Sequence, residues 1–204
     1  MNIYLVRHAE CFKNLIGIPG GDGASLTPLG IMQANKLGEA LRPCVEKKAT
    51  LIACPPRQTA ETAAIIGRTL GIDSKIEPLF ASINLGVLNG VPIKEASSRY
   101  PKSSASMERW RSNLSEIEDL QIDGMENPWD FYKRGLRGIL KYRKCENLIV
   151  CSTTSIMILF IHISNKITPR AGDGYKSIEF ENAEIMNVVF DNSMFEWFYK
   201  ILDC

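Results

Sequence analysis

The sequence predicts an α/β fold, a three-layer α/β/α sandwich around a mostly parallel sheet. Short runs rich in β-branched and other apolar residues alternate with longer segments whose apolar residues recur at helical spacing. This alternation is typical of parallel sheets covered by helices on both faces, and such sheets bind ligands at the carboxyl ends of their strands. A length of 204 residues fits one domain, and the chain contains no internal repeat or long linker. We therefore predict a single domain over residues 1–204.

The first half of the chain is predicted to form two strand–helix units followed by a third strand. Each strand is a short apolar run that ends in a polar or proline-containing turn, and each helix carries apolar residues three and four positions apart. Pro43 stops the first helical pattern, and Gly71 ends the second in the left-handed cap that glycine favours. The predicted elements, in order, are the strand Asn2–Val6, the helix Leu29–Leu41, the strand Thr50–Cys54, the helix Thr59–Leu70 and a strand around Lys75–Pro78.

The pattern weakens in the middle of the chain, where Gly, Pro and Ser residues interrupt short helical stretches such as Met107–Asn113. We predict that Phe80–Asn127 forms an insertion or lid segment. Beyond this segment a proline opens a helix, because its fixed φ suits the first helical position. The elements predicted there are the helix Pro128–Tyr142, the strand Asn147–Cys151, the buried helix Thr153–Ser164 and three tail strands, Ser177–Phe180, Glu184–Phe190 and Met194–Ile201.

The charge balance indicates a small-molecule partner. Twenty-four Lys and Arg residues against 23 Asp and Glu residues give a net charge of +1, without the field that nucleic-acid binders and membrane-surface proteins usually carry. The longest apolar run, Ile156–Ile163, is too short to span a bilayer, and the first residues do not form a signal peptide. The six cysteines lack the close pairing of a disulfide framework. We predict a cytoplasmic protein without a nucleic-acid or membrane partner and without a cofactor; a homodimer stays open.

Three polar loops leave the carboxyl ends of predicted strands, and in a parallel sheet these ends meet at one edge. The first loop begins Arg7-His8, the second contains Arg57-Gln58, and the third is Ser152–Thr154. An Arg next to a His at such an edge offers a bidentate phosphate clamp beside a nucleophile or general base. By spacing alone this signal is weak.

The order of residues around these loops resembles the histidine phosphatase superfamily, which includes the phosphoglycerate mutases. The resemblance rests on Leu5-Val6-Arg7-His8-Ala9-Glu10, Asn14, Leu26-Thr27-Pro28-Leu29-Gly30, Gln33-Ala34, Glu61-Thr62-Ala63, Gly86, Gly90, Gly124, Glu126 and Arg134. It covers most of the chain. The resemblance implies a phosphoglycerate mutase-like fold in which His8 is the phosphorylated nucleophile, while Arg7 and Asn14 bind the phosphoryl oxygens.

The resemblance also implies that three positions of the site are degenerate. The family's second phosphate-binding Arg falls on Gln58, with Arg57 one place earlier as a remaining anion-binding candidate. The acidic proton donor falls on Ser82, and the second His falls on Ser152. The only other histidine, His162, would lie on the order of 15 Å along the helix from Ser152, so we predict it to be a core residue.

These losses lead to the main functional hypothesis. A general acid contributes a factor of roughly 10² to 10⁴ to the rate, and one electrostatic donor contributes about 10² to 10³. Even if these losses combine only in part, a rate lower by roughly 10⁴ would leave little ordinary phosphatase turnover. Binding by Arg7 and Arg57 would outlast catalysis. We therefore expect a degenerate histidine phosphatase that binds a phosphorylated or anionic small molecule with weak or no phosphatase activity.

Other interpretations stay open at this point. One is an active phosphomonoesterase or mutase that uses His8, with Arg57 as the second clamp and Glu126 as the acid, on an easy leaving group such as an acyl phosphate. Another is a different, non-phosphatase reaction in the remodelled pocket, for example at a zinc ion held by His8 and the three thiols near it. The replacement of a small Ser or Thr of the family by a small Cys explains these cysteines more simply. A third is an interaction protein with a tryptophan-bearing surface. The residues behind the last two are Cys11, Cys54, Cys151, Trp110, Trp129 and Trp197.

Overall fold

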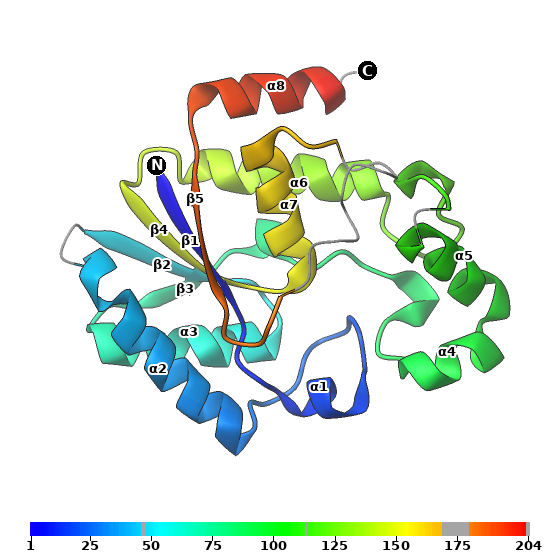
Figure 1. The fold of residues 1–204 in the computed structure, drawn as a ribbon, viewed down its shortest axis with the longest axis horizontal. Helices are drawn as coiled ribbons and strands as arrows, with labels where there is room; N and C mark the ends of the chain where they lie inside the picture. The colour runs from blue at the N-terminus through cyan, green and yellow to red at the C-terminus, as the bar shows by residue number, and fades with distance from the viewer. Residues whose placement is uncertain (46–47, 113, 169–179, 203–204) are drawn as a thin grey trace.

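The computed structural model describes residues 1–45, 48–112, 114–168 and 180–202. Within these residues, five strands form one sheet in the order β3-β2-β4-β1-β5 (Figure 1). All neighbours pair in parallel except β5, which runs antiparallel to β1. The strands are β1 (Asn2–Arg7), β2 (Ala49–Ala53), β3 (Ser74–Ile76), β4 (Asn147–Ser152) and β5 (Ile185–Val189). The predicted α/β fold with a mostly parallel sheet is confirmed.

Helices cover both faces of the sheet. Side chains of a strand alternate between its faces, and β1 shows this plainly, because Val6 packs with α2 and α3 whereas Ile3 and Leu5 pack with the helices of the opposite face. The first layer holds α2 (Pro28–Val45) and α3 (Arg57–Leu70), and the other holds α6 (Pro128–Lys141), α7 (Thr154–Asn165) and α8 (Asn192–Leu202) (Figure 1). α3 ends at Gly71 in the left-handed conformation, as predicted.

The region between β3 and α6 contains short helices beside the sheet (Figure 1). Leu88, Met107 and Ile122 are buried together there and form a small apolar cluster of their own. The helices are the 3₁₀ turns Pro78–Phe80, Gly86–Leu88 and Ile117–Asp119 with α4 (Ile93–Arg99) and α5 (Pro101–Arg111). A short helix that the sequence did not predict, α1 (Phe12–Ile16), follows β1.

Two predictions about the elements were wrong. The tail segment Met194–Ile201 lies in the helix α8 and not in a strand. Phe195 and Phe198 are both buried in the main core, and a spacing of three residues puts two side chains on one face of a helix but on opposite faces of a strand. Likewise α2 continues through Pro43 to Val45, because a proline in the last turn removes only one amide donor and its carbonyl clash falls near the helix end.

Other expectations at the ends of elements have mixed outcomes. The third strand ends at Ile76, before Pro78 opens a 3₁₀ turn. The predicted strand Ser177–Phe180 lies mostly outside the described residues. His162 is fully buried and shares a hydrogen bond of 2.9 Å between its Nδ1 and the Tyr132 hydroxyl, so the prediction of a core histidine is confirmed. None of the described helices is long and apolar enough to cross a bilayer.

Candidate active site

The three polar loops meet at the carboxyl edge of the sheet, as the parallel pairing predicts. Arg7 stands opposite Ser152 in the β1–β4 register. The His8 amide donates to the Ser152 carbonyl at 3.0 Å, and the Cys54 amide donates to the Cys151 carbonyl at 2.9 Å. These backbone bonds carry the strand pairing one residue into each loop and fix the positions from which the site side chains project.

His8 is held as a neutral imidazole. Its ring is buried, with only 6% of the residue exposed, and its Nδ1 lies 2.8 Å from the Ala9 carbonyl oxygen. A carbonyl only accepts, so Nδ1 carries the proton and the lone pair resides on Nε2. Burial lowers the pKa of His8 to about 4, with a further lowering by the charges of Arg7 and Lys13. The Nε2 atom is therefore unprotonated at neutral pH.

Arg7 lies next to His8 and is held by the C-terminal segment. One terminal nitrogen of its guanidinium donates to the Phe180 carbonyl, while its Nε is buried with no hydrogen-bond partner in the described part of the chain. Burial lowers the pKa of Arg7, and the carboxylates of Glu181 and Glu184 oppose this. Part of the guanidinium that the resemblance assigns to phosphate binding is thus committed to the protein's own backbone.

Asn14 lies on α1, where its amide oxygen accepts three contacts. The donors are the Cys11 amide at 2.9 Å, the Cys11 thiol at 3.1 Å and the Asn182 side-chain amide at 3.0 Å. Asn182 also donates to the His8 carbonyl at 3.5 Å, so it links α1 to the loop that begins at His8. The oxygen of Asn14 is fully used, and its side-chain NH₂ group is the part that can donate to an anion.

Arg57 and Gln58 begin α3 and take different environments. Arg57 is exposed and pairs with Glu61 on the same helix at 2.7 Å. Gln58 is buried, and its amide oxygen accepts from the Ala24 amide at 3.2 Å. The neutral side chain at position 58 therefore supports the loop around Ala24, whereas the neighbouring cation is neutralised by a carboxylate.

The two serines at the other positions that the resemblance implies to be degenerate also bond to protein groups. Ser152 is fully buried, and its hydroxyl donates to the Val6 carbonyl at 3.2 Å. The Ser82 hydroxyl lies 2.9 Å from that of Thr153, which in turn lies 3.4 Å from the Ser155 hydroxyl. Neither serine brings a charge or a proton-transfer group to the site.

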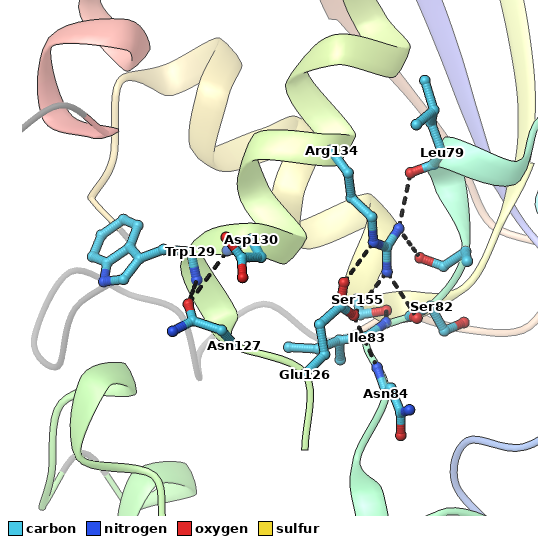
Figure 2. A network of polar contacts seen from close by, with 11 residues as sticks. Leu79, Ser82, Ile83, Asn84, Glu126, Asn127, Trp129, Asp130, Arg134 and Ser155 are labelled. Atoms are coloured by element: carbon cyan, nitrogen blue, oxygen red, sulfur yellow. Dashed lines mark hydrogen bonds and ion pairs between the residues drawn. The ribbon is translucent and has the colours of Figure 1, made fainter. Parts of the chain in front are cut away.

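Arg134 on α6 organises the loop that carries Ser82 (Figure 2). Its five N–H donors are all used: two donate to the carboxylate of Glu126, at 2.6 and 2.9 Å, and three donate to backbone carbonyls at 2.7 to 3.0 Å. The carbonyls belong to Leu79, Ala81 and Ser82. Glu126 further accepts from the Asn84 amide at 3.2 Å, so its carboxylate is bound on both oxygens within this network.

A cavity of about 370 Å³ opens between the second loop and the Ser82 loop. Its walls include the two proline rings that follow β2, and the only charged side chain among them is a carboxylate. The polar lining residues are Asp22, Ser82, Asn84 and Asn89, and the prolines are Pro55 and Pro56. The cavity suits a polar, uncharged portion of a ligand better than an anionic one.

The cysteines near the site are buried thiols. Burial raises the pKa of Cys54 to about 12 and raises the pKa of Cys151 still further, so both are protonated thiols at neutral pH. Cys11, Cys54 and Cys151 are free of disulfides. Across the described residues, no group of three or more His, Cys, Asp or Glu side chains is arranged to hold a metal ion.

Comparison with known proteins places this chain in a family. The sequence profile of the histidine phosphatase superfamily (branch 1) matches residues 3–198. The chain belongs to the histidine phosphatase superfamily. Among curated members, a probable phosphoglycerate mutase of Yersinia pestis is 30% identical over 115 residues, which cover 56% of this chain and 49% of the relative. A probable phosphoglycerate mutase of Erwinia tasmaniensis is 30% identical over 128 residues, or 62% and 52% of the two chains. The chain spans about half the length of the curated relatives that it matches.

Solved structures of several phosphatases have the same fold. A mycobacterial glucosyl-3-phosphoglycerate phosphatase aligns with a TM-score of 0.74 at 15% identity and covers 91% of both chains. A putative α-ribazole-5′-phosphate phosphatase from Escherichia coli gives 0.76 at 18% identity, over 92% of this chain and 89% of that one. A phosphoserine phosphatase variant from Entamoeba histolytica, in complex with phosphoserine, gives 0.72 at 20% identity, over 94% and 91%.

Several residues that contact the candidate site were missed by the sequence prediction. Phe180 and Asn182 contact Arg7, His8 and Asn14 from the opposite end of the chain, and no local pattern marks them. Lys13 was passed over although it precedes Asn14, and its charge alone could have drawn attention to it. It acts on His8 as described above.

Proposed function

We propose that this protein is a degenerate histidine phosphatase that binds a phosphorylated small molecule and has weak or no phosphatase activity. The observation that carries the proposal is the state of the three altered positions. Gln58, Ser82 and Ser152 are neutral, and each forms hydrogen bonds to protein groups. No carboxylic acid stands at position 82 to protonate a leaving oxygen.

The binding half of the proposal rests on the groups that remain. Arg7 keeps guanidinium donors beyond the one that reaches Phe180, and the NH₂ group of Asn14 is available on exposed α1. The cavity of about 370 Å³ between the second loop and the Ser82 loop would give room for the rest of a small phosphomonoester. Solved relatives in complex with phosphoserine and with 3-phosphoglyceric acid are consistent with ligands of this class.

Calorimetry tests the binding half. A panel of phosphomonoesters is titrated into the unmodified protein, the Arg7→Ala variant and the Arg143→Ala variant, whose exposed arginine lies beyond the end of α6. We expect binding by the unmodified protein and by Arg143→Ala, and at least a tenfold weaker association for Arg7→Ala, because a charge-assisted hydrogen bond is lost. No heat of binding from the unmodified protein with any ester would refute this half.

One observation favours a second candidate, an active phosphotransferase or phosphatase that works on easy leaving groups. The His8 tautomer leaves the Nε2 lone pair ready to attack phosphorus. In that step an N–P bond forms, the P–O bond to the leaving group breaks, and the electron pair departs with the leaving oxygen. An acyl or aryl phosphate leaves as a stabilised anion, so the absence of an acid at Ser82 costs less.

A single-turnover assay separates the two candidates. Acyl and aryl phosphates labelled in the phosphoryl group are mixed with the protein, and label on His8 is sought, with His8→Ala as the control. The main proposal predicts binding with no label or a trace that decays slowly. Label that forms on His8 and is lost to water at a rate typical of enzymes would establish the active phosphatase instead.

A further inference from the structure

The arginines near the candidate phosphate site use many of their hydrogen-bond donors within the protein. Arg57 is paired with Glu61, and all donors of Arg134 are used within its own network. One terminal nitrogen of Arg7 donates to the Phe180 carbonyl, and its Nε is buried. A phosphate dianion bound beside His8 would thus meet little positive charge beyond the remaining donors of the Arg7 guanidinium.

Lys13 lies where the missing charge is needed. It projects from α1, which follows the His8 loop directly, and its side chain is only partly exposed. Its Nζ donates to the Gly20 carbonyl and stands against Gly21, where an added Cβ would lie 3.4 Å from the ammonium nitrogen. Gly21 lines the cavity beside Asp22. The ammonium group is therefore at the rim of the cavity.

The charge of Lys13 interacts both with Asp22 at the rim of the cavity and with His8. Burial lowers the pKa of Lys13 and the carboxylate of Asp22 opposes this, while the charge of Lys13 adds to the lowering of the His8 pKa by burial, so the ammonium interacts with both groups. Lys13 forms no ion pair with any residue of the described chain. An ammonium has three donors, and Gly20 uses one of them, so two can face a ligand.

We propose that Lys13 is a phosphate-binding residue of the His8 site and supplies the positive charge that the neutral Gln58 lacks. This proposal rests on the proposed function, because it takes the ligand to be a phosphomonoester. The phosphoryl group would lie between Nε2 of His8 and Nζ of Lys13, with the remainder of the ligand directed into the cavity past Asp22. In this arrangement the positive charge comes from Lys13 on α1 and not from position 58 at the start of α3, so the site keeps its charge with a different geometry.

Calorimetric titration with inorganic phosphate at fixed ionic strength tests the proposal. The proteins compared are the unmodified chain, Lys13→Gln, Lys13→Arg and Lys36→Gln. Glutamine keeps a donor for the Gly20 carbonyl but removes the charge, and Lys36 is an exposed lysine on α2 that gives the matched substitution. We expect phosphate binding to weaken about tenfold or more in Lys13→Gln and to stay near that of the unmodified protein in Lys36→Gln and Lys13→Arg.

A ligand-free measurement accompanies the titration. The chain has two histidines, so nuclear magnetic resonance can follow the His8 ring alone after assignment with a His8→Gln variant. Loss of the Lys13 charge should raise the pKa of His8 in Lys13→Gln, and Lys36→Gln should leave it unchanged.

The outcomes are distinguishable. If the unmodified protein binds phosphate and Lys13→Gln binds it equally well, the role of Lys13 is refuted while the proposed function stands. If the unmodified protein does not bind phosphate or any ester, both proposals fail. Weakened binding in Lys13→Gln together with a raised His8 pKa supports the role of Lys13.

Discussion

Replacement of Arg134 by methionine should destabilise the protein and loosen the wall of the cavity. Methionine keeps an apolar stem over the Phe131 ring, against which the guanidinium now lies at 4.9 Å, but removes every donor. Three carbonyls would lose the guanidinium donors from which they accept, and the Glu126 carboxylate would keep only the Asn84 amide (Figure 2). The effect should therefore arise from unsatisfied polar groups and not from lost packing.

The magnitude follows from burial. The side chains of Arg134 and Glu126 are 19% and 20% exposed, so most of the ion pair is shielded from water. Removal of one partner of a buried pair costs about 3–5 kcal/mol, and entry of water to a one-fifth exposed site favours the lower end. We expect a loss of about 3 kcal/mol in the free energy of unfolding, which for a chain of this length is a fall in Tm of roughly 6–12 °C.

Denaturant unfolding followed by circular dichroism measures this change, with Arg137→Met as the control. Arg137 is an exposed arginine on the same helix, and its replacement should stay within about 0.5 kcal/mol. A double-mutant cycle with Glu126→Gln isolates the ion pair, because in the Arg134→Met background the second change removes an unpaired charge and should be neutral or stabilising. A loss below about 1 kcal/mol for Arg134→Met would refute the reasoning.

Three further predictions concern protonation, a buried carboxylate and a glycine turn. Because the pKa of His8 falls to about 4 in the folded state, the unfolded chain binds more protons than the folded protein below about pH 6.5. The free energy of unfolding should therefore fall by roughly 3 kcal/mol as the pH drops from 6.5 towards 4, and the His8→Gln variant should lack this pH-dependent loss in denaturant unfolding. Glu77→Gln should cost about 2–3 kcal/mol in denaturant unfolding, because the buried carboxylate accepts from Lys141 at 2.6 Å; an unchanged midpoint would contradict this. Gly86→Ala should cost more than about 3 kcal/mol in thermal unfolding, because a Cβ at its φ of +57° would lie 2.0 Å from the Asp123 carbonyl oxygen, and a cost below about 1 kcal/mol would count against it.

The sequence predicted the edge of the sheet where the site lies, because parallel strands bring their carboxyl ends together whatever their order. The pairing of Arg7 with Ser152 depends on that rule alone. The helix α8 was not predicted, because its apolar residues fit both a helical and an alternating pattern over a short stretch. Only packing on the core decides between the two.

The side-chain partners within the site could not be predicted for a physical reason. Arg57 and Glu61 are four residues apart on one helix, a spacing that favours pairing, yet which way Arg57 turns depends on the neighbouring loops. The contacts of Phe180 and Asn182 join residues 168 to 174 positions apart, and no periodicity carries information over that distance. Lys13 has a charge that is visible in the sequence, but its proximity to the cavity comes from the fold.

The contacts from the C-terminal segment to the His8 loop have a consequence for the order of folding. The Phe180 and Asn182 groups that hold Arg7 and His8 lie 173 and 174 positions from them along the chain, and closing so long a loop delays their contact. The site is therefore one of the last parts of the molecule to form. A ligand that recognises the completed site should leave the folding rate unchanged and should act by slowing unfolding.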